Sequence, residues 1–255
     1  MEIASHIEQL KADGARMAET IGMAKGLDAP VPSCPDWILG DLVGHQGAIH
    51  RWATAFVSGG ITDPGQVDFE ALRQSNPGGE GLASWFIEGH AALVSALEEA
   101  DGDVECFTFM AAPSPLAFWA RRQAHETAIH RLDTELTAGV APTMVAPVFA
   151  SDGIDEMLRG FLPRRHKSAV SPVPLTLLVL CSDTSRSWRV TMGPDGLVCE
   201  VGVGVGGDSD GAECSVMGPA CDLYYALWNR CGLGALSVEG NPEVIDELLG
   251  RTQLR

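Results

Sequence analysis

Apolar residues in the first third of the chain recur at steps of three and four, the spacing that places them on one face of an α-helix. The first run spans residues 3–21 and comprises Ile3, Ile7, Leu10, Gly14, Met17 and Ile21. A second run follows the turn sequence VPSCPDW, whose two prolines stop a helix. Its members are Ile38, Leu42, His45, Ile49, Trp52 and Phe56, and Gly59 and Gly60 end the predicted helix.

Two further helical stretches follow in the sequence. LASWFIEGHAALVSALEEA carries a looser apolar stripe, formed by Leu82, Phe86, His90, Leu93 and Leu97. A fourth helix is predicted from about Leu116 to about Leu136. Four long helices with apolar stripes are typical of a four-helix bundle.

The pattern changes after about Thr137. DGIDEMLRGFL indicates a short helix and HKSAVSPVP a linker, and from Leu175 the period becomes two. The predicted strands are LTLLVLC, SWRVTM, LVCEVGVGVGG, AECSVMG and LSVEG, with a hairpin turn at MGPDG and two helices, PACDLYYALWNR and NPEVIDELLGR. GVGVGGDSDG lacks the following helix of a phosphate loop, so we expect a hairpin or loose loop there. The predicted class is α+β in two domains, residues 1–160 and 170–255.

Composition excludes several classes of protein. With 34 acidic and 17 basic residues the net charge is −17, which argues against a nucleic-acid or anionic-membrane partner because phosphates require a basic surface. Seven cysteines without a CxxC pair fit a disulfide framework poorly, so reduced thiols in a cytosol are expected. The charged N-terminus does not match a signal peptide, and no apolar stretch is long enough to span a bilayer. We therefore expect a cytoplasmic protein, either a monomer or a homodimer.

The segment RRQAHETAIHRLD, residues 121–133, nearly matches the zinc-protease motif HExxH, but one residue too many separates the glutamate from the second histidine. On a helix, His125 and His130 diverge by roughly 140°, whereas the protease motif needs both histidines on one face. Glu126 and His130 are four residues apart and project from the same face. This pair has the spacing of two metal ligands.

His45 lies in the second apolar stripe, where leucine or isoleucine would be expected. An unpaired polar group in a bundle core costs about 1–3 kcal/mol, so His45 needs a partner. A metal bound by His45, Glu126 and His130 would satisfy all three side chains. Two histidines and one carboxylate with an open position form the ligand set of a catalytic divalent metal, most often zinc.

The residues alone leave other interpretations open. A core histidine is commonly hydrogen-bonded to a carbonyl or a carboxylate without any metal. Glu126 and His130 would form an ordinary surface pair if the arginines of this helix mark a solvated face; these are Arg121, Arg122 and Arg131.

Three other histidines are weaker candidates for metal ligands. His50 lies off the stripe, and His90 has no second ligand nearby in the sequence. His125 is expected to contact a ligand residue from outside or to face water.

Three segments resemble the mycothiol-dependent maleylpyruvate isomerase family. VPSCPDWILGDLVGHQGAIHRWA resembles its N-terminal motif, FWARRQAHETAIHRLDTEL its second motif, and GPACDLYYALWNR followed by LSVEGNPEVIDELL its C-terminal domain. The resemblance implies a DinB-like four-helix bundle that holds a divalent metal, usually zinc, and a small α/β domain similar to sterol carrier proteins. The family's metal ligands fall on His45, Glu126 and His130, and an arginine near its substrate falls on Arg230.

The resemblance also implies a metal-dependent and mycothiol-dependent isomerase or S-transferase, in which a metal-bound thiolate attacks a small electrophilic substrate. Loss of the thiol after bond rotation gives isomerisation, and its retention gives S-conjugation. The chain departs from the family's pattern at Asp36 and Ile38, which leaves the substrate open. Two alternatives remain: a hydrolase that uses metal-bound water, and a non-catalytic binding or regulatory protein on the same fold.

Overall fold

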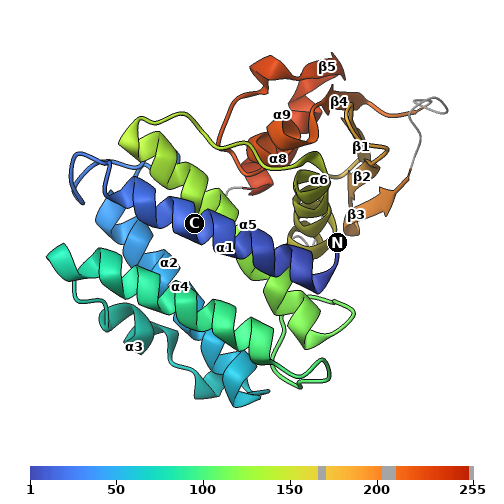
Figure 1. Ribbon diagram of the computed structural model, residues 1–255. Coiled ribbons are helices and arrows are strands. Elements are labelled where there is room, and N and C mark those ends of the chain that lie inside the picture. Colours follow the sequence, from blue (N-terminus) through green and yellow to red (C-terminus); the bar gives the residue numbers. More distant parts are fainter. Residues whose placement is uncertain (166–170, 203–210, 253–255) are drawn as a thin grey trace. The chain divides into compact units, whose positions relative to one another are not determined.

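The computed structural model describes residues 1–165, 171–202 and 211–252, and the chain divides into two compact units, Met1–Thr143 and Met144–Arg255. The first unit is helical, and the second combines a sheet with helices (Figure 1). The α+β class expected from the change of periodicity is therefore confirmed. Most of the predicted linker HKSAVSPVP and of the glycine-rich segment GVGVGGDSDG lies outside the described residues.

Four long helices form the bundle of the first unit (Figure 1). They are α1 (Ile3–Ile21), α2 (Leu39–Gly59), α4 (Leu82–Glu99) and α5 (Pro115–Ala138). α1 packs against α5 and α4, and α2 packs against α4 and α5. The connection between α2 and α4 contains η1 (Pro64–Gln66), α3 (Phe69–Gln74) and η2 (Gly79–Gly81). None of the helices that the structure describes is long and apolar enough to cross a membrane.

Local sequence signals set the ends of α2 and α5, which carry the candidate ligands. The Ser114 hydroxyl accepts a hydrogen bond from the Ala117 amide at 3.1 Å, and a proline occupies the first position of α5. At the start of α2 the Asp41 carboxylate accepts a hydrogen bond from the Ile38 amide at 3.1 Å. Gly60 ends α2 with a φ of 58°, a left-handed conformation that glycine adopts without a steric penalty.

The buried face of α2 differs from the predicted stripe. Leu42 and Phe56 are fully buried, but four members of the stripe keep solvent exposure: Ile38, His45, Ile49 and Trp52. Gln46 is fully buried instead. The cause is a glycine, since a Cβ at Gly47 would lie only 2.3 Å from the ring of Trp85 on α4. α4 therefore packs closely on a face of α2 that the apolar periodicity does not mark.

The second unit is built on a five-stranded mixed sheet of order β3-β2-β1-β4-β5. The strands are β1 (Leu175–Cys181), β2 (Ser187–Gly193), β3 (Gly196–Val201), β4 (Cys214–Gly218) and β5 (Ser237–Gly240). β1 runs parallel to β4, and the other neighbouring strands are antiparallel. Gly193 pairs with Gly196, so the predicted turn is a two-residue hairpin.

Helices complete the second unit. Among the described residues, three helices precede the sheet: α6 (Pro147–Asp155), the π-helical η3 (Glu156–Phe161) and α7 (Leu162–Arg165). Between β4 and β5 lie α8 (Ala220–Leu227) and η4 (Leu233–Ala235), and α9 (Pro242–Thr252) follows β5. α6 packs on α8, and the Trp188 indole donates a hydrogen bond to the Asp155 carboxylate at 3.1 Å. α6 thus belongs to the second compact unit, whereas the predicted limit at residue 160 grouped it with the bundle.

Candidate metal centre

Three side chains that are distant in the sequence converge inside the bundle: His45, Glu126 and His130. One potential ligand atom of each lies within 4.8 Å of the other two. His130 Nε2 is 3.3 Å from Glu126 Oε1, and His45 Nε2 is 3.6 Å from the same oxygen. The His45 side chain is 27% exposed, and the Glu126 side chain is 19% exposed. A small molecule can therefore approach the cluster from solvent.

The helices bring these atoms together by simple geometry. Glu126 and His130 lie on successive turns of α5, and the four-residue spacing aims both side chains to one side. His45 lies in α2, which packs against α5. The partial exposure of His45 corrects the expectation that it lies in the apolar interior: it lies where the interior opens to solvent.

The two separations from Glu126 Oε1 to the histidine nitrogens fit a metal ion. Zinc ligands lie about 2.1 Å from the ion, so neighbouring ligand atoms of a tetrahedral site are about 3.4 Å apart. The two measured separations, 3.3 and 3.6 Å, bracket this value. Both exceed the about 2.7–2.9 Å of a good charge-assisted hydrogen bond. With three protein ligands, a tetrahedral ion would keep one open position.

Arg122 lies beside the cluster and pairs with its carboxylate. The Arg122 Nη2 donates to Glu126 Oε2 at 2.6 Å, which leaves Oε1 directed at the two histidines. Burial raises the pKa of Glu126, but Arg122 and the nearby rings of His130 and His45 outweigh it and hold that pKa well below its usual range. Glu126 is therefore an anion at neutral pH, the form that binds a cation.

His130 is held from its other ring nitrogen. Nδ1 lies 2.9 Å from Asp133 Oδ2, and the Ser33 hydroxyl donates to Asp133 Oδ1 at 2.5 Å. Asp133 is fully buried. Burial lowers the pKa of His130, but the hydrogen bonds to Asp133 and Glu126 outweigh it and raise the pKa to about 9. The sequence analysis missed Asp133, although its position three residues after His130 placed it on the same face of α5.

Aromatic rings line the approach to the histidines. Trp37, in the segment between α1 and α2, has its ring centroid 5.0 Å from that of His45. The same indole is stacked on His130, with centroids 6.4 Å apart and planes at 21°. Phe69 of α3 meets His45 edge-on at 6.5 Å. These rings place apolar surface directly beside the two histidines of the cluster.

The remaining histidines of the bundle lie elsewhere. His50, a weaker candidate for a metal ligand, is fully buried, and its Nε2 lies 2.9 Å from the Thr127 hydroxyl. His90 Nε2 contacts the carbonyl of Leu10 at 3.0 Å. His125 was expected to contact a ligand residue or face water.

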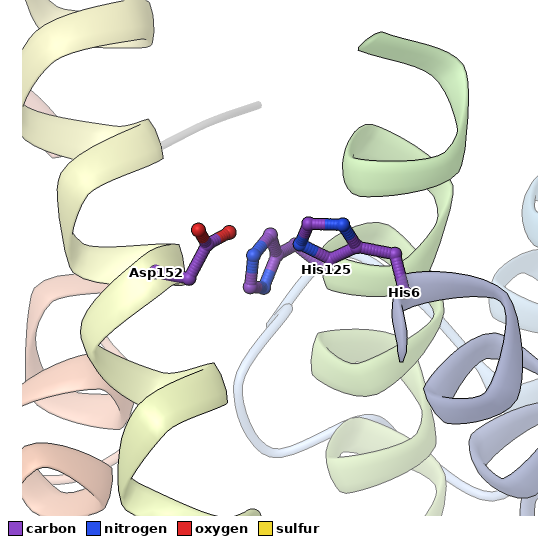
Figure 2. Close-up of side chains that lie close together, drawn as sticks. All are labelled: His6, His125 and Asp152. Carbon is purple, nitrogen blue, oxygen red and sulfur yellow. The ribbon is translucent and has the colours of Figure 1, made fainter. Parts of the chain in front are cut away.

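In the structure His125 is fully buried. Its ring meets that of His6, which extends from α1, with centroids 6.0 Å apart (Figure 2). His125 and His130 point to different sides of α5, so a zinc-protease arrangement of these two histidines is excluded.

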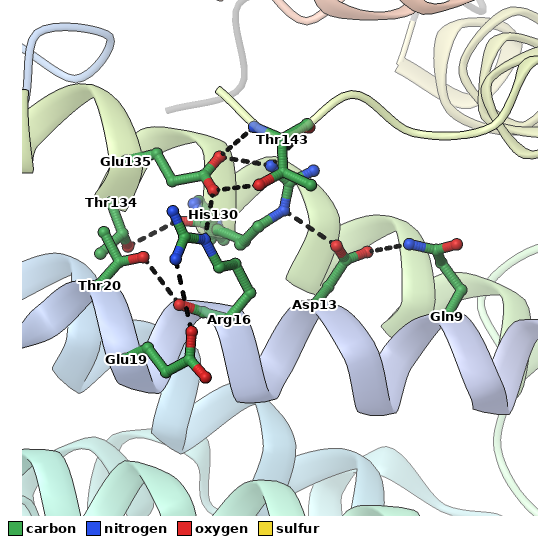
Figure 3. A network of polar contacts seen from close by, with 10 residues as sticks. Gln9, Asp13, Arg16, Glu19, Thr20, His130, Thr134, Glu135 and Thr143 are labelled. Carbon is green, nitrogen blue, oxygen red and sulfur yellow. Dashed lines mark hydrogen bonds and ion pairs between the residues drawn. The ribbon is translucent and has the colours of Figure 1, made fainter. Parts of the chain in front are cut away.

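Two arginines that the sequence analysis took as signs of a solvated face are buried. Arg122 is 2% exposed and Arg131 is fully buried. Arg131 donates to Asp13 of α1 at 2.9 Å and to Glu135 at 2.5 Å, within the network that Figure 3 shows. The surface-pair interpretation fails for this reason: each buried arginine has a carboxylate partner, which makes a charged face compatible with burial.

Arg230 belongs to the second unit, and the expectation that it reaches the metal ligands remains a prediction. The helix that carries it was predicted to include Arg230, but α8 ends at Leu227 because Asn229 adopts a left-handed φ of 58°. Arg230 is partly buried, and its Nη1 donates to the Trp228 carbonyl at 2.7 Å.

Five of the seven cysteines have raised thiol pKa values. All seven are free thiols. Burial raises the pKa of Cys199 to about 12, and burial also raises the pKa of Cys106, Cys181, Cys214 and Cys231. A thiol is reactive only as the thiolate, so these five groups are unreactive at neutral pH.

Comparison with known proteins places this bundle in a family. The family model described as the mycothiol maleylpyruvate isomerase N-terminal domain matches residues 7–135, just over half of the chain. The chain belongs to this family. The match includes all three residues of the cluster, together with Ser33 and Asp133. No curated protein sequence matches the chain.

Solved structures of a family enzyme share the fold over both units. A crystal structure of the mycothiol-dependent maleylpyruvate isomerase superposes with a TM-score of 0.64 at 13% identity, covering 94% of this chain and 93% of that one. A histidine-to-alanine mutant of the mycothiol-dependent maleylpyruvate isomerase gives 0.63 at 14% identity, with the same coverage. At identities this low, the superpositions establish the fold of this chain alone.

Proposed function

We propose that the chain is a metal-dependent and mycothiol-dependent isomerase or S-transferase that acts on a small electrophilic substrate. The observation that carries the proposal is the convergence of His45, Glu126 and His130 at metal-ligand spacing in a member of this family. The net charge of −17 favours a small molecule over a nucleic acid as the second substrate.

The residues of the cluster have separate roles in the proposed reaction. A divalent ion held by the three side chains, zinc in our proposal, would lower the pKa of a thiol that shares its open position. Arg122 keeps Glu126 anionic and fixes which carboxylate oxygen faces the histidines. The rings of Trp37 and Phe69 limit water beside the thiol and provide an apolar surface for the electrophile.

Arg230 is proposed to contact the second substrate, on the family resemblance alone. A guanidinium binds carboxylate groups in a bidentate manner, so its expected role is to orient an acidic electrophile. Arg230→Ala should then raise KM for an acidic substrate while metal affinity stays unchanged. Equal KM values for acidic substrate in the variant and the wild type would exclude the role.

The proposed function is tested with maleylpyruvate as the probe. The metal-loaded protein is incubated with maleylpyruvate in the presence and absence of mycothiol, and loss of substrate and of free thiol are followed separately. Isomerisation consumes substrate with no net loss of thiol, whereas S-transfer consumes both equally. Turnover of an ester or amide without any thiol would instead favour the hydrolase alternative.

Replacement of His45 separates the metal site from the fold. His45→Ala removes one of three ligands, so we expect loss of bound metal and of mycothiol-dependent turnover with the helical content retained. His90→Ala is the matched control. His90 is also partly buried in the bundle, but its side chain is hydrogen-bonded to the backbone carbonyl of Leu10 and is not a candidate ligand. A His45→Ala variant with wild-type metal content would overturn the proposal.

A further inference from the structure

Asp133 connects two parts of the bundle that both border the candidate metal centre. One carboxylate oxygen is 2.9 Å from Nδ1 of His130, and the other accepts the Ser33 hydroxyl at 2.5 Å. Ser33 lies a hundred residues earlier in the chain, in the segment between α1 and α2. The Asp133 side chain is fully buried, so water does not compete for these contacts.

The contact with Nδ1 fixes the state of the His130 ring. A carboxylate accepts a hydrogen bond, so in the neutral form that binds a metal the proton stays on Nδ1 and the lone pair lies on Nε2. That nitrogen is the one 3.3 Å from Glu126 Oε1. Without Asp133 the ring could take either tautomer and could rotate, and both changes weaken a ligand.

The contact with Ser33 fixes the segment that carries Trp37. Backbone bonds close this segment into a loop: the Val31 amide donates to the Trp37 carbonyl at 2.9 Å, and Pro30 and Ile38 form an isolated bridge. The hydrogen bond from the Ser33 side chain to Asp133 ties this loop to α5. The Trp37 ring in turn lies against both His45 and His130.

We propose that Asp133 is a positioning residue of the metal centre: it orients His130 through Nδ1 and, through Ser33, holds the loop that places Trp37 against the two ligand histidines. The inference rests on the proposed function, because it assumes that His130 Nε2 binds an ion. It adds a defined task for two side chains, Asp133 and Ser33, that bind neither ion nor substrate.

A purely structural role for Asp133 is the competing explanation, and Glu135 provides the comparison. Glu135 is a second fully buried carboxylate on α5, bonded to Arg131, Arg16 and Thr143 (Figure 3). It has no described contact with His130. If Asp133 only stabilises the bundle, Asp133→Asn and Glu135→Gln should have similar consequences.

The first test compares metal affinity, with Co²⁺ and Zn²⁺ measured by chelator competition on the full chain. We expect Asp133→Asn to weaken binding about 10–100-fold, the usual effect of losing such a partner of a ligand histidine. Glu135→Gln should lower the unfolding midpoint but leave affinity within about threefold of wild type. Equal affinities in Asp133→Asn and wild type would overturn the inference.

Ser33→Ala separates the two tasks of Asp133. The variant keeps the contact with His130, so metal affinity should stay within about threefold of wild type. Its loop loses an anchor, so quenching of Trp37 fluorescence by bound Co²⁺ should fall; the Trp37 contribution is obtained by subtracting the same measurement on Trp37→Phe. Unchanged quenching in Ser33→Ala would remove Ser33 from the inference.

A measurement on the wild type covers the case in which Asp133→Asn does not fold. Nitrogen-15 NMR of the zinc-loaded protein reports which nitrogen of each histidine carries a proton, and His130→Gln identifies the signal. We expect a protonated, hydrogen-bonded Nδ1 and an unprotonated Nε2. The reverse assignment would overturn this inference alone, whereas a wild-type chain that binds neither ion would overturn it together with the proposed function.

Discussion

The imidazole of His50 lies uncharged in the interior of the bundle, where it is fully buried. Its Nε2 is 2.8 Å from the Gln46 amide nitrogen and 2.9 Å from the Thr127 hydroxyl, and its buried Nδ1 has no hydrogen-bond partner among the residues that the structure describes. Burial lowers the pKa of His50 well below 6.5, and nearby His90 lowers it further. A group of this kind makes stability depend on pH.

We expect the free energy of unfolding to fall as the pH drops below about 6.5. There the unfolded chain protonates His50 while the folded chain does not, so the unfolded state gains up to about 1.4 kcal/mol per pH unit until the folded pKa is reached. Urea unfolding between pH 8 and pH 5 measures this slope. Burial lowers the pKa of His90 too, so part of the slope remains in His50→Gln.

The contribution of His50 is the difference between the two proteins. This contribution should be absent above pH 7 and grow toward pH 5. Arg51 and His130 also lower the pKa of His50, whereas Glu126 raises it. Parallel curves for wild type and His50→Gln across this range would show that His50 titrates alike in the folded and unfolded states, contrary to the prediction.

At the residue scale, helical spacing was enough to find Glu126 and His130, because two residues four apart must project together. It was not enough for their partners. Arg122 was taken as a sign of solvent, since an arginine is usually exposed, and its pairing with Glu126 depends on how deeply α5 is buried. Asp133 shares a face of α5 with His130 by its spacing of three residues, but its contact with Ser33 joins distant parts of the sequence.

At the element scale, α1 and α5 are joined by buried charges in addition to apolar packing. Arg131 is bonded to Asp13 of α1 at 2.9 Å and to Glu135, and Arg16 of α1 donates to Glu135 at 3.0 Å (Figure 3). Burial raises the pKa of Asp13, and Arg131 opposes that rise. Arg131 therefore favours the charged form of Asp13, and the hydrogen bonds from Thr143, together with Arg131 and Arg16, lower the pKa of Glu135.

Arg131→Met should lower the free energy of unfolding by about 3–5 kcal/mol, because it leaves buried carboxylates without their partner. Arg73→Met is the matched control: Arg73 pairs with Glu70 at 2.6 Å on the surface of α3, where such pairs contribute little. Urea unfolding of both variants at pH 7 measures the difference. Equal midpoints for the two would show that the α1–α5 network does not stabilise the bundle.

The contact between α2 and α4 depends on a glycine. A Cβ at Gly47 would lie 2.3 Å from Trp85, and Trp85 is itself held by the guanidinium of Arg51, 3.9 Å from its ring centroid. We expect Gly47→Ala to lower the free energy of unfolding by about 1–3 kcal/mol through overpacking. Gly250→Ala in α9, with open space around it, should instead raise it by up to about 1 kcal/mol. Stabilisation by both changes would contradict the close packing of α2 on α4.

The same glycine explains why periodicity located the helices but not their faces. Apolar steps of three and four mark large side chains, and these predicted α1, α2, α4 and α5 near their observed ends. On α2 the closest approach of a neighbour occurs at Gly47, which carries no apolar side chain to count. The stripe therefore predicted an inward-facing His45, whereas the observed packing leaves it partly exposed at the candidate site.

At the scale of the whole molecule, the groups proposed to hold the metal all lie in one compact unit. Residues 1–143 contain the three ligands together with Arg122, Asp133 and Ser33. Arg230, the proposed substrate contact, lies in the other unit. Metal binding and turnover therefore place different demands on the chain.

Thr143 marks where the first unit ends. Its amide and hydroxyl donate to Glu135 at 2.9 and 2.6 Å, and its carbonyl accepts from Arg131 at 2.8 Å. These bonds complete the α1–α5 network from beyond the end of α5. A protein truncated before Thr143 leaves buried charged groups with fewer partners, whereas one truncated after it keeps them all.

We therefore expect a truncated chain ending at residue 146 to fold and to bind Co²⁺ with wild-type affinity, yet to show no turnover of maleylpyruvate with mycothiol. A chain ending at residue 139 keeps all of α5 but loses the three hydrogen bonds of Thr143. All three involve a charged side chain, and a hydrogen bond of this kind contributes about 1.5–3 kcal/mol. Its unfolding midpoint should be clearly lower, although its ligands are the same. Chelator competition, urea unfolding and the turnover assay on the two truncated proteins test this. Full activity of either truncated protein would show that the second unit contributes nothing to catalysis. Equal unfolding midpoints for the two truncated proteins would show that the bundle does not end at Thr143.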